Sequence, residues 1–284
     1  MPRLGIRMEK YLDPGAPALS ISSKAILHCR EDQPVGDVIP LMLQNHRRLP
    51  VISQTGKYFR GVVSSSDILD FLGAGEKYLI YRTRFDGLAM PVGRIISQAA
   101  PLAENHTILE ALRHFRLHGK GFHPVLENRK IAGVVTEWDF VKHINKPTGV
   151  KVSEAMTQKP VFLREHDTVL EAGKAMVRGG YRRLPVVSGP SKKGSAQQRL
   201  AGIATPRDIL RHLSRAKRLG RLPRERTPVS HAMNPHVITI TPEKDVYEAV
   251  MLMGAHRVNC LPVVNQHNGL AGIITEKDIL DAMH

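Results

Sequence analysis

Residues Gly272-Ile-Ile-Thr-Glu-Lys-Asp-Ile279 carry a pattern that the chain contains four times. The pattern is glycine, two apolar residues, Ser or Thr, two variable residues, an aspartate and an apolar residue. Its other copies start at Gly61, Gly133 and Gly202, and the four aspartates recur at intervals of 72, 69 and 70 residues. A constant period of this length indicates one supersecondary unit that is repeated through the chain.

A second pattern keeps the same period. Its copies are Arg48-Leu-Pro-Val-Ile52, Phe122-His-Pro-Val-Leu126, Arg183-Leu-Pro-Val-Val187 and Cys260-Leu-Pro-Val-Val264. With both patterns in phase, the chain resembles the CBS domain family, whose nucleotide-sensing domains usually occur in pairs called Bateman modules. The resemblance covers about residues 20–283, and four copies in order are similar to the gamma subunit of AMP-activated protein kinase and its stand-alone archaeal relatives.

The last repeat predicts the order strand, helix, strand, strand, helix. Residues 236–242 alternate apolar and polar side chains, which indicates a strand, and Asp245-x-x-Glu248 indicates a capping box at the start of a helix. The apolar runs 261–264 and 270–274 flank a turn-forming segment and predict a hairpin, and a final helix is expected after Thr275.

The other repeats follow this order, so the predicted fold class is α+β with four β-α-β-β-α CBS repeats. One such unit is too small to bury its apolar faces, and we expect the repeats to pair about approximate two-fold axes. The polar segment 145–149 separates the predicted modules, 20–145 (repeats about 20–72 and 92–144) and 150–284 (repeats about 152–213 and 229–283). Three polar or basic segments stand out between elements: 73–84, 188–198 and 215–226.

Composition narrows the class of protein. The chain of 284 residues has a formal charge of +15 and a pI near 10.1, a balance that attracts polyanions without naming one. The cysteines, Cys29 and Cys260, are expected to be small buried residues rather than a disulfide or metal pair. No apolar stretch reaches membrane-spanning length and no secretory signal is evident, so we expect a cytoplasmic protein with no membrane partner.

The repeated Ser/Thr-x-x-Asp has two interpretations. It is an ordinary helix start, in which the hydroxyl and the carboxylate cap the backbone. In CBS proteins that bind adenine nucleotides, the matching Ser or Thr contacts phosphate and the matching Asp accepts hydrogen bonds from ribose. The resemblance therefore implies candidate phosphate and ribose pairs at Ser64/Asp67, Thr136/Asp139, Thr205/Asp208 and Thr275/Asp278.

Basic residues beside the second pattern distinguish the first and third repeats from the second and fourth. Arg47 and Arg48 in the first repeat, and Arg182 and Arg183 in the third, stand where family members use Arg, His or Lys on phosphates, and guanidinium groups suit phosphate oxygens. The second and fourth repeats carry Gly121-Phe122 and Asn259-Cys260 there. His256 and Arg257 are the nearest phosphate candidates in the fourth repeat. The sites of Asp67 and Asp208 are therefore favoured.

The remaining motifs are less specific. By resemblance, the segments entering the third and fourth repeats supply base-binding candidates, although core packing explains each residue singly: Met156, Thr157, Val161, Met233 and Val237. His114, His118 and His123 lack the carboxylate that a zinc helix would add, and no motif of a catalytic nucleophile or phosphate-binding loop is present.

The leading hypothesis is a non-enzymatic regulatory module. It would bind AMP, ADP, ATP or a related adenosyl ligand between paired repeats and signal occupancy to an effector protein, with no cofactor beyond this nucleotide. The exposed module faces imply association, either between the two halves of this chain or with a second copy in a homodimer. The alternative, motivated by the charge and by residues 215–226, is a basic scaffold that associates with nucleic acid and uses no mononucleotide.

Overall fold

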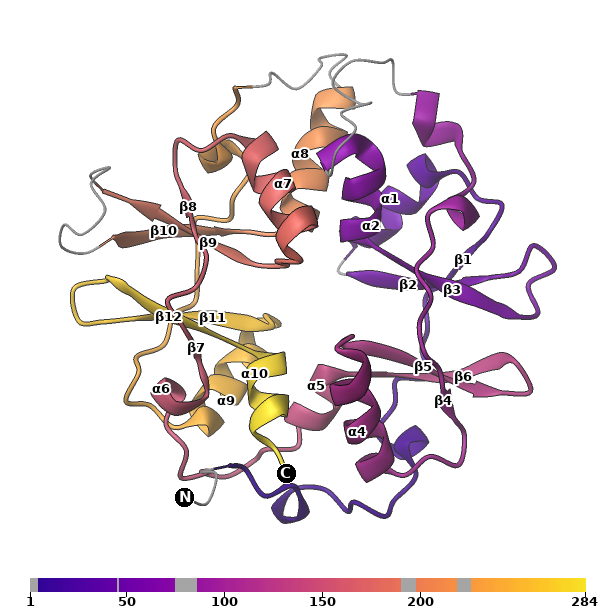
Figure 1. The fold of residues 1–284 in the computed structure, drawn as a ribbon, viewed down its shortest axis with the longest axis horizontal. Coiled ribbons are helices and arrows are strands. Elements are labelled where there is room, and N and C mark those ends of the chain that lie inside the picture. Colours follow the sequence, from indigo (N-terminus) through magenta and orange to yellow (C-terminus); the bar gives the residue numbers. More distant parts are fainter. Residues whose placement is uncertain (1–4, 45, 75–85, 190–197, 219–225) are drawn as a thin grey trace.

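The structure is a computed structural model that describes residues 5–44, 46–74, 86–189, 198–218 and 226–284. Four small sheets lie around the centre of a disc, two from each half of the chain (Figure 1). The helices of the first and third repeats lie together at one end, and those of the second and fourth lie together at the other. Most of the segments 73–84, 188–198 and 215–226 singled out above lies outside the described residues.

Four α+β repeats are present, which confirms the predicted fold class; the order β-α-β-β-α is complete in three of them, and in the fourth the first strand is reduced to a single bridge. In each of the first three repeats a two-residue strand pairs parallel with the next strand, which pairs antiparallel with the last. The elements are β1 Cys29–Arg30, α1 Val35–Leu43, β2 Arg48–Ile52, β3 Phe59–Ser64 and α2 Ser65–Leu69; β4 Leu102–Ala103, α4 Ile108–His118, β5 Phe122–Glu127, β6 Lys130–Thr136 and α5 Glu137–Val141; α6 Val152–Ala155, β7 Thr157–Gln158, β8 Leu163–Arg164, α7 Val169–Gly179, β9 Leu184–Ser188, β10 Arg199–Ala204 and α8 Pro206–Arg218; α9 Val246–His256, β11 Cys260–Val264, β12 Leu270–Thr275 and α10 Glu276–Ala282.

The strand predicted over residues 236–242 was wrong. Only Ile240 forms a bridge, parallel to Val263 of β11. The pairing with β11 does not continue past this bridge. The Pro242 carbonyl instead accepts a hydrogen bond from the backbone N–H of Ser153 in α6 (3.0 Å). The alternating pattern here marks a half-buried connection rather than a regular strand.

The capping box predicted for Asp245 and Glu248 was also wrong. The Asp245 carboxylate accepts hydrogen bonds from the backbone N–H groups of Tyr247 (2.7 Å) and Gly149 (2.8 Å) and from the hydroxyl of Thr148 (2.8 Å). Glu248 instead pairs with Lys244 at 2.8 Å on the surface. Asp245 thus caps α9 and at the same time holds the connection between the two halves of the chain. Capping boxes do form at the first helix of the second repeat, between Thr107 and Glu110, and of the third, between Thr168 and Glu171.

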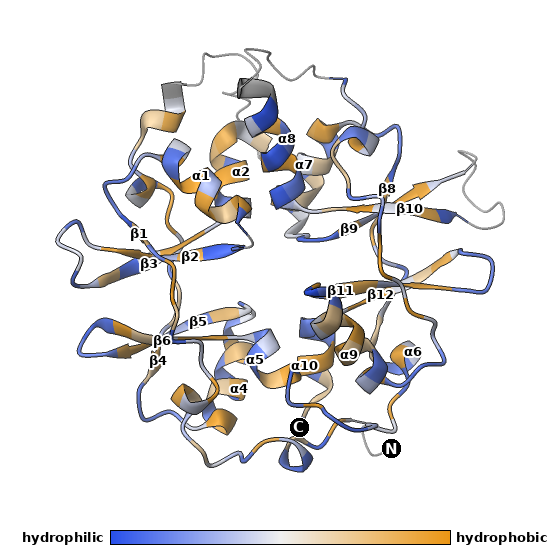
Figure 2. Ribbon diagram, turned by 180° about the vertical axis from the view of Figure 1, so that it is seen from behind, coloured by the Kyte–Doolittle hydropathy of each residue, from blue (hydrophilic) through white to orange (hydrophobic). Residues whose placement is uncertain are grey.

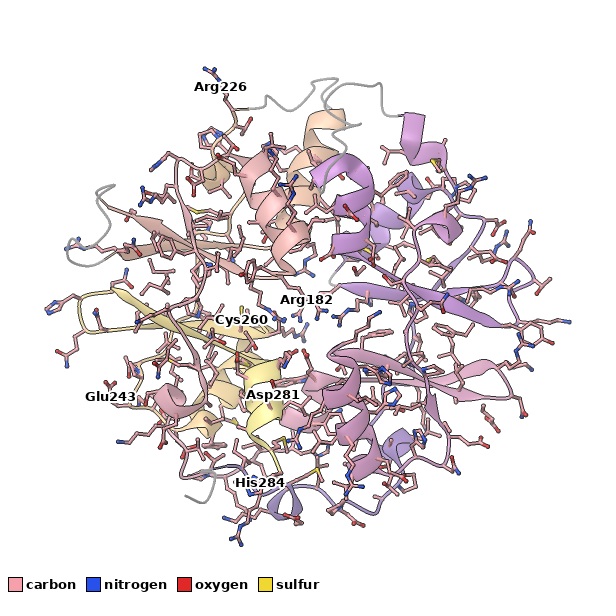
Figure 3. All side chains as sticks on the ribbon, viewed as in Figure 1. Arg182, Arg226, Glu243, Cys260, Asp281 and His284 are labelled. Atoms are coloured by element: carbon pink, nitrogen blue, oxygen red, sulfur yellow. The ribbon has the colours of Figure 1, made fainter. Side chains whose placement is uncertain are left out.

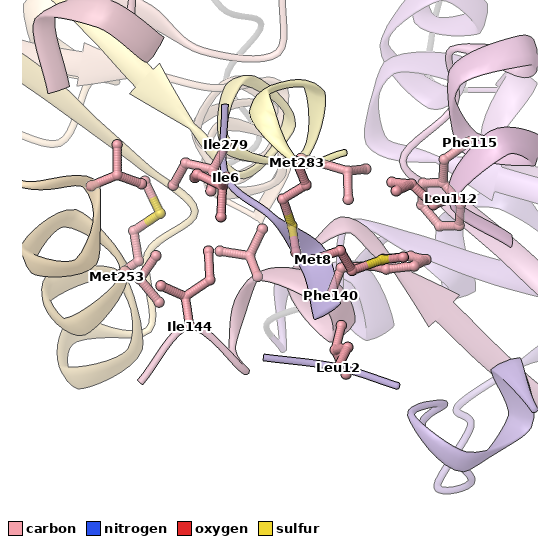
Figure 4. Close-up of a cluster of buried hydrophobic side chains, with 14 of the residues drawn as sticks. Ile6, Met8, Leu12, Leu112, Phe115, Phe140, Ile144, Met253, Ile279 and Met283 are labelled. Carbon is pink, nitrogen blue, oxygen red and sulfur yellow. The ribbon is translucent and has the colours of Figure 1, made fainter. Parts of the chain in front are cut away.

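Two large apolar cores each combine one repeat from either half of the chain. The first and third repeats share one core, in which α2 packs against α7 and α8. The second and fourth repeats share the other, where α5 packs against α10. Ile6, Met8 and Leu12 of the N-terminal segment enter this second core (Figure 4). The cores therefore fix the position of the two halves relative to each other.

Smaller apolar clusters join the repeats within each half. Val62, Ala99, Phe122 and Val134 connect the first repeat with the second. Ile203, Cys260 and Ile273 connect the third with the fourth. Cys29 and Cys260 are both buried, and burial raises the pKa of the Cys29 thiol to about 12. The two cysteines therefore pack as small apolar residues.

Replacement of Asp245 by alanine is expected to lower the free energy of unfolding by about 1–2 kcal/mol, because the start of α9 and the connection at residues 148–149 lose their shared acceptor. Urea denaturation followed by circular dichroism measures the change. Glu248→Ala is the matched control, since it removes only an exposed ion pair and should change stability by less than about 0.5 kcal/mol. Equal losses in the two variants would contradict the assigned role of Asp245.

Candidate functional site

The repeated aspartates stand at equivalent positions, one turn into the second helix of each repeat. Oδ2 of each carboxylate accepts two hydrogen bonds from the preceding Ser or Thr, one from the backbone N–H at 2.7–3.0 Å and one from the hydroxyl at 2.6–2.7 Å. The four pairs are Ser64/Asp67, Thr136/Asp139, Thr205/Asp208 and Thr275/Asp278. The capping interpretation of the motif is therefore confirmed in every repeat.

The second carboxylate oxygen distinguishes the four sites. Oδ1 of Asp67 accepts a hydrogen bond from the hydroxyl of Ser97 at 2.7 Å, and Oδ1 of Asp278 accepts one from Thr157 at 2.9 Å. Both hydroxyls come from the segment that enters the partner repeat of the same half.

The other two aspartates bind cations of their own helix. Oδ1 of Asp139 lies 2.7 Å from Nζ of Lys142, and Oδ1 of Asp208 lies 2.6 Å from Nη1 of Arg211. A neutral hydroxyl can be exchanged for another hydroxyl without leaving a charge unpaired, whereas displacing Lys142 or Arg211 breaks an ion pair. Of the two sites favoured from the sequence, those of Asp67 and Asp208, only Asp67 therefore has an Oδ1 free of such an ion pair, a property that it shares with Asp278.

Asp67 lies in the wall of a cavity of about 270 Å³. Ser64, Ser97 and Lys120 supply polar groups from the first half of the chain. Met176 and Val177, on α7 in the other half, supply an apolar part of the lining. The cavity thus contacts three repeats, and anything that fills it touches both halves of the chain.

A larger cavity of about 490 Å³, called the central cavity below, lies between the two halves of the chain. All four repeats line it, and it shares Arg48, Arg182, Ser64, Ser66 and Phe122 with the cavity of Asp67. The end of β2 that faces the centre is hydrophilic (Figure 2), and Arg182 lies close to the centre (Figure 3). Six arginines contribute to its lining: Arg47, Arg48, Arg182, Arg183, Arg207 and Arg257.

The arginines lie close enough to affect one another. Burial, and then the positive charge of Arg183, lowers the pKa of Arg47 to about 10. Burial, and then the charge of Arg182, lowers the pKa of Arg48 to about 9. Both groups still carry a positive charge at neutral pH, so the cavity holds a concentrated positive charge that favours an anion.

Two buried polar groups of this cavity lack partners. Nη2 of Arg48 and Nδ2 of Asn259 are enclosed and have no hydrogen-bond acceptor among the described residues. Asn259 is 8% exposed and lines the central cavity. An unpaired buried donor costs about 1–3 kcal/mol, so an acceptor bound in the cavity would relieve a real penalty.

The second and fourth repeats contribute carboxylates to the central cavity. Glu137 and Glu276 are the first residues of α5 and α10, and both line the central cavity. The Glu137 carboxylate occupies the space above Gly121, where a Cβ would lie only 2.2 Å from it. Glu276 lies 3.8 Å from Nη1 of Arg47.

Sequence reasoning missed these two glutamates. They stand at a variable position of the repeated motif. A comparison of the four repeats would have found them, because the matching residues in the first and third repeats, Ser65 and Pro206, are uncharged. Sequence reasoning also missed Ser97. This residue lies in the segment that enters the second repeat and donates its hydroxyl hydrogen bond to Asp67, as the base-binding candidate Thr157 in the segment that enters the third repeat does to Asp278.

The other candidate residues are distributed unevenly. Ser64, Thr136, Thr205 and Arg257 line the central cavity, whereas Thr275 and His256 line neither of the two cavities. Met156 and Met233 pack against the glycines of the facing hairpins, Gly272 and Gly202. Val237 packs against the small cluster between the third and fourth repeats, and Val161 is 45% exposed.

The histidines considered as metal ligands make other contacts in the structure. His123 is buried, with its two ring nitrogens 2.7 Å from the carbonyl oxygens of Ala100 and Lys120, and its ring contacts that of His114. Within the described residues no group of three or more His, Cys, Asp or Glu side chains has a metal-binding arrangement. The described helices also include none that is long and apolar enough to cross a bilayer.

Known proteins resemble the chain over most of its length. It is 28% identical over 250 residues to the uncharacterised protein MJ1225 of Methanocaldococcus jannaschii, covering 83% of this chain and 86% of that protein. It is 31% identical over 260 residues to an uncharacterised 33.4 kDa protein from the ribosomal RNA operon of Thermofilum pendens, covering 86% and 83%. The crystal structure of MJ1225, described as a candidate archaeal homologue of the gamma subunit of AMP-activated protein kinase, superposes with a TM-score of 0.83 at 26% identity over 94% of this chain and 99% of the other.

The sequence pattern of the CBS domain matches four segments, residues 18–74, 92–146, 152–215 and 229–284. These segments contain all of the repeated motifs and both cavities' principal polar residues. The chain belongs to the CBS domain family and carries four copies of the domain.

Proposed function

We propose that the chain is a non-enzymatic regulatory module that binds an adenine nucleotide in the cavity of Asp67, with the phosphates directed toward the central arginines. The observation that carries this proposal is the position of Asp67 in a cavity that shares Arg48 and Arg182 with the central cavity. The similarity to a protein described as a homologue of the gamma subunit of AMP-activated protein kinase supports it.

The ribose would bind at Oδ1 of Asp67. Each carboxylate oxygen has two acceptor sites, and Oδ1 uses one of them for the hydroxyl of Ser97. A ribose hydroxyl therefore either joins Ser97 or replaces it. Oδ2 keeps its two bonds to Ser64 in both cases, so the start of α2 stays capped while the ligand binds.

The phosphates would bind next to Arg48 and Arg182. Both side chains line the two cavities, and Nη2 of Arg48 is an unpaired donor. Lys120 adds a further positive charge in the cavity of Asp67. Charge-assisted hydrogen bonds from guanidinium groups to phosphate are among the strongest polar contacts in proteins.

Occupancy would be transmitted through the relative position of the two halves of the chain. The ligand contacts the first and second repeats through Asp67 and Ser97, and the third through α7 and Arg182. A ligand that bridges these parts stabilises one arrangement of them over others. An effector protein that binds the disc would read this change.

A binding site for nucleic acid is the rival function, supported by the charge of +15. Six arginines, however, line an internal cavity of about 490 Å³, which is within the range of small-molecule sites, about 300–1,000 Å³. This geometry favours a mononucleotide over a duplex or a long single strand.

Asp67→Ala is expected to weaken AMP binding by about tenfold or more, because ribose loses a charged acceptor. Isothermal titration calorimetry with AMP, ADP, ATP and guanine nucleotides measures affinity and stoichiometry. Asp139→Ala is the matched control: it removes the same cap from α5, but its second oxygen is already paired with Lys142, so a smaller change is expected.

An unchanged AMP affinity in Asp67→Ala would reject the site. A loss confined to Asp139→Ala would place the ribose at Asp139 instead. Thermal melting of both variants is recorded in parallel, because each loses a capping box that contributes about 1 kcal/mol.

Trp138 provides a direct signal for the central cavity. It is the only tryptophan of the chain, it lines this cavity, and its ring lies against Gly254. Phosphates bound next to the arginines should change its emission during a titration with AMP or ATP but not with adenosine, which lacks the charge. A response to adenosine equal to that for ATP would show that the phosphates lie elsewhere.

Salt dependence separates the two functions. A polyanion that makes 6–10 phosphate contacts loses about 10³–10⁵ in affinity between about 50 and 200 mM salt, whereas a mononucleotide makes few such contacts. We expect AMP affinity to fall by less than about tenfold over this range. Tight RNA binding at physiological salt with no mononucleotide binding would support the scaffold instead.

A further inference from the structure

The central cavity contains two carboxylates that a site for phosphates does not require. Glu137 and Glu276 enter it from facing helices, α5 and α10, which pack against each other in the shared core. Glu276 has 9% of its side chain exposed and lies 3.8 Å from Arg47. The glycine at position 121 leaves room for the carboxylate of Glu137, so its place in the cavity is built into the chain.

Glu276 and Glu137 act as internal counter-ions for the arginines. Each negative charge in the cavity reduces the net positive charge that an incoming anion meets. An anion also repels the carboxylates directly, since the same cavity holds both. The anion and the ionised glutamates therefore compete for the arginines.

We infer that anion binding in the central cavity is coupled to the uptake of a proton by Glu276, so that this residue makes the affinity for phosphate-bearing ligands depend on pH. The inference rests on the proposed function for the identity of the ligand, but the coupling concerns any anion that enters the cavity. The proton comes from solvent and is held by the Glu276 carboxyl group while the anion is bound.

The direction of the effect follows from the charges around Glu276. Burial raises its pKa to about 7, opposed by Arg47 and Arg183 and supported by Glu137 and Asp139. An added anion raises this pKa further. Below about pH 7 the group is already protonated and affinity is independent of its titration, whereas above that value binding requires proton uptake and weakens.

The remaining titratable groups of the cavity are mainly cationic. His46 carries the one imidazole among the described residues that line the cavity and needs its own control. The thiol of Cys260 and the carboxylate of Asp278 lie close to the cavity lining. The groups that line the cavity with Glu276 are His46, Arg47, Arg48, Arg182, Arg183, Arg207, Arg257 and Glu137.

The experiment uses inorganic sulfate as the probe, because it stays dianionic across the range studied and adds no titration of its own. Binding to the full chain is followed by Trp138 emission and by calorimetry between about pH 6 and 9. For wild type, affinity should fall by up to about tenfold per pH unit above about pH 7. Glu276→Gln should remove most of this slope and bind sulfate about tenfold more tightly at about pH 8.

Three controls surround this comparison. His46→Gln should keep the slope above about pH 7, and Glu248→Gln, an exposed glutamate of α9, should behave as wild type. If Glu276→Gln does not fold, calorimetry of wild type at about pH 7.5 in buffers of different ionisation enthalpy measures proton uptake directly. Absence of uptake, a slope retained in Glu276→Gln, or no sulfate binding at all each overturns the inference.

The outcome for the nucleotide is independent of this result. If AMP binds but shows no proton coupling that depends on Glu276, the inference fails and the proposed function stands. If sulfate binds with the predicted pH dependence but no adenine nucleotide binds at any pH, the proposed function fails and the coupling stands.

Discussion

The structure depends on the fact that no single repeat can bury its own helices. Each repeat places two helices on a sheet of three short strands, and the outer faces of these helices remain apolar until another repeat covers them. The chain meets this requirement across its two halves, with the first repeat against the third and the second against the fourth. This packing turns the starts of the central strands and of the second helices toward the middle of the disc, where residues such as Arg47 and Glu276 meet.

The charge pattern of the centre arises from differences between repeats rather than from what they share. At the position just before the central strand, the chain has Arg47, Gly121, Arg182 and Asn259 in turn. At the first position of the second helix it has Ser65, Glu137, Pro206 and Glu276. Because the fold superposes these positions around one cavity, cationic repeats face acidic ones. If all four repeats carried arginine before the central strand and none carried glutamate on the second helix, the cavity would hold only positive charge, and no group in it would compete with a bound anion.

The two periodic motifs were enough to predict the four units and the order of their elements, because glycine, proline and capping residues act locally. The errors came where a side chain has a distant partner. Asp245 was expected to form a capping box with Glu248, but it binds Thr148 and Gly149, 97 and 96 residues away. The sequence likewise placed Arg47 and Arg182 at equivalent positions, but only the packing of α2 against α7 and α8 brings them to one cavity. Glu276 was overlooked for the same reason, since its significance lies in facing Arg47.

Capping and ligand binding are compatible uses of the same aspartate. The cap occupies Oδ2 and fixes the direction of the carboxylate, which leaves Oδ1 pointing toward the segment that enters the partner repeat. That segment then decides what the oxygen does. A hydroxyl at Ser97 or Thr157 keeps it available for exchange, while a cation at Lys142 or Arg211 on the same helix satisfies it. Four identical motifs can therefore serve one structural role in all repeats and a binding role in some of them, depending on the hydroxyl of the entering segment and on the residue three positions after the aspartate.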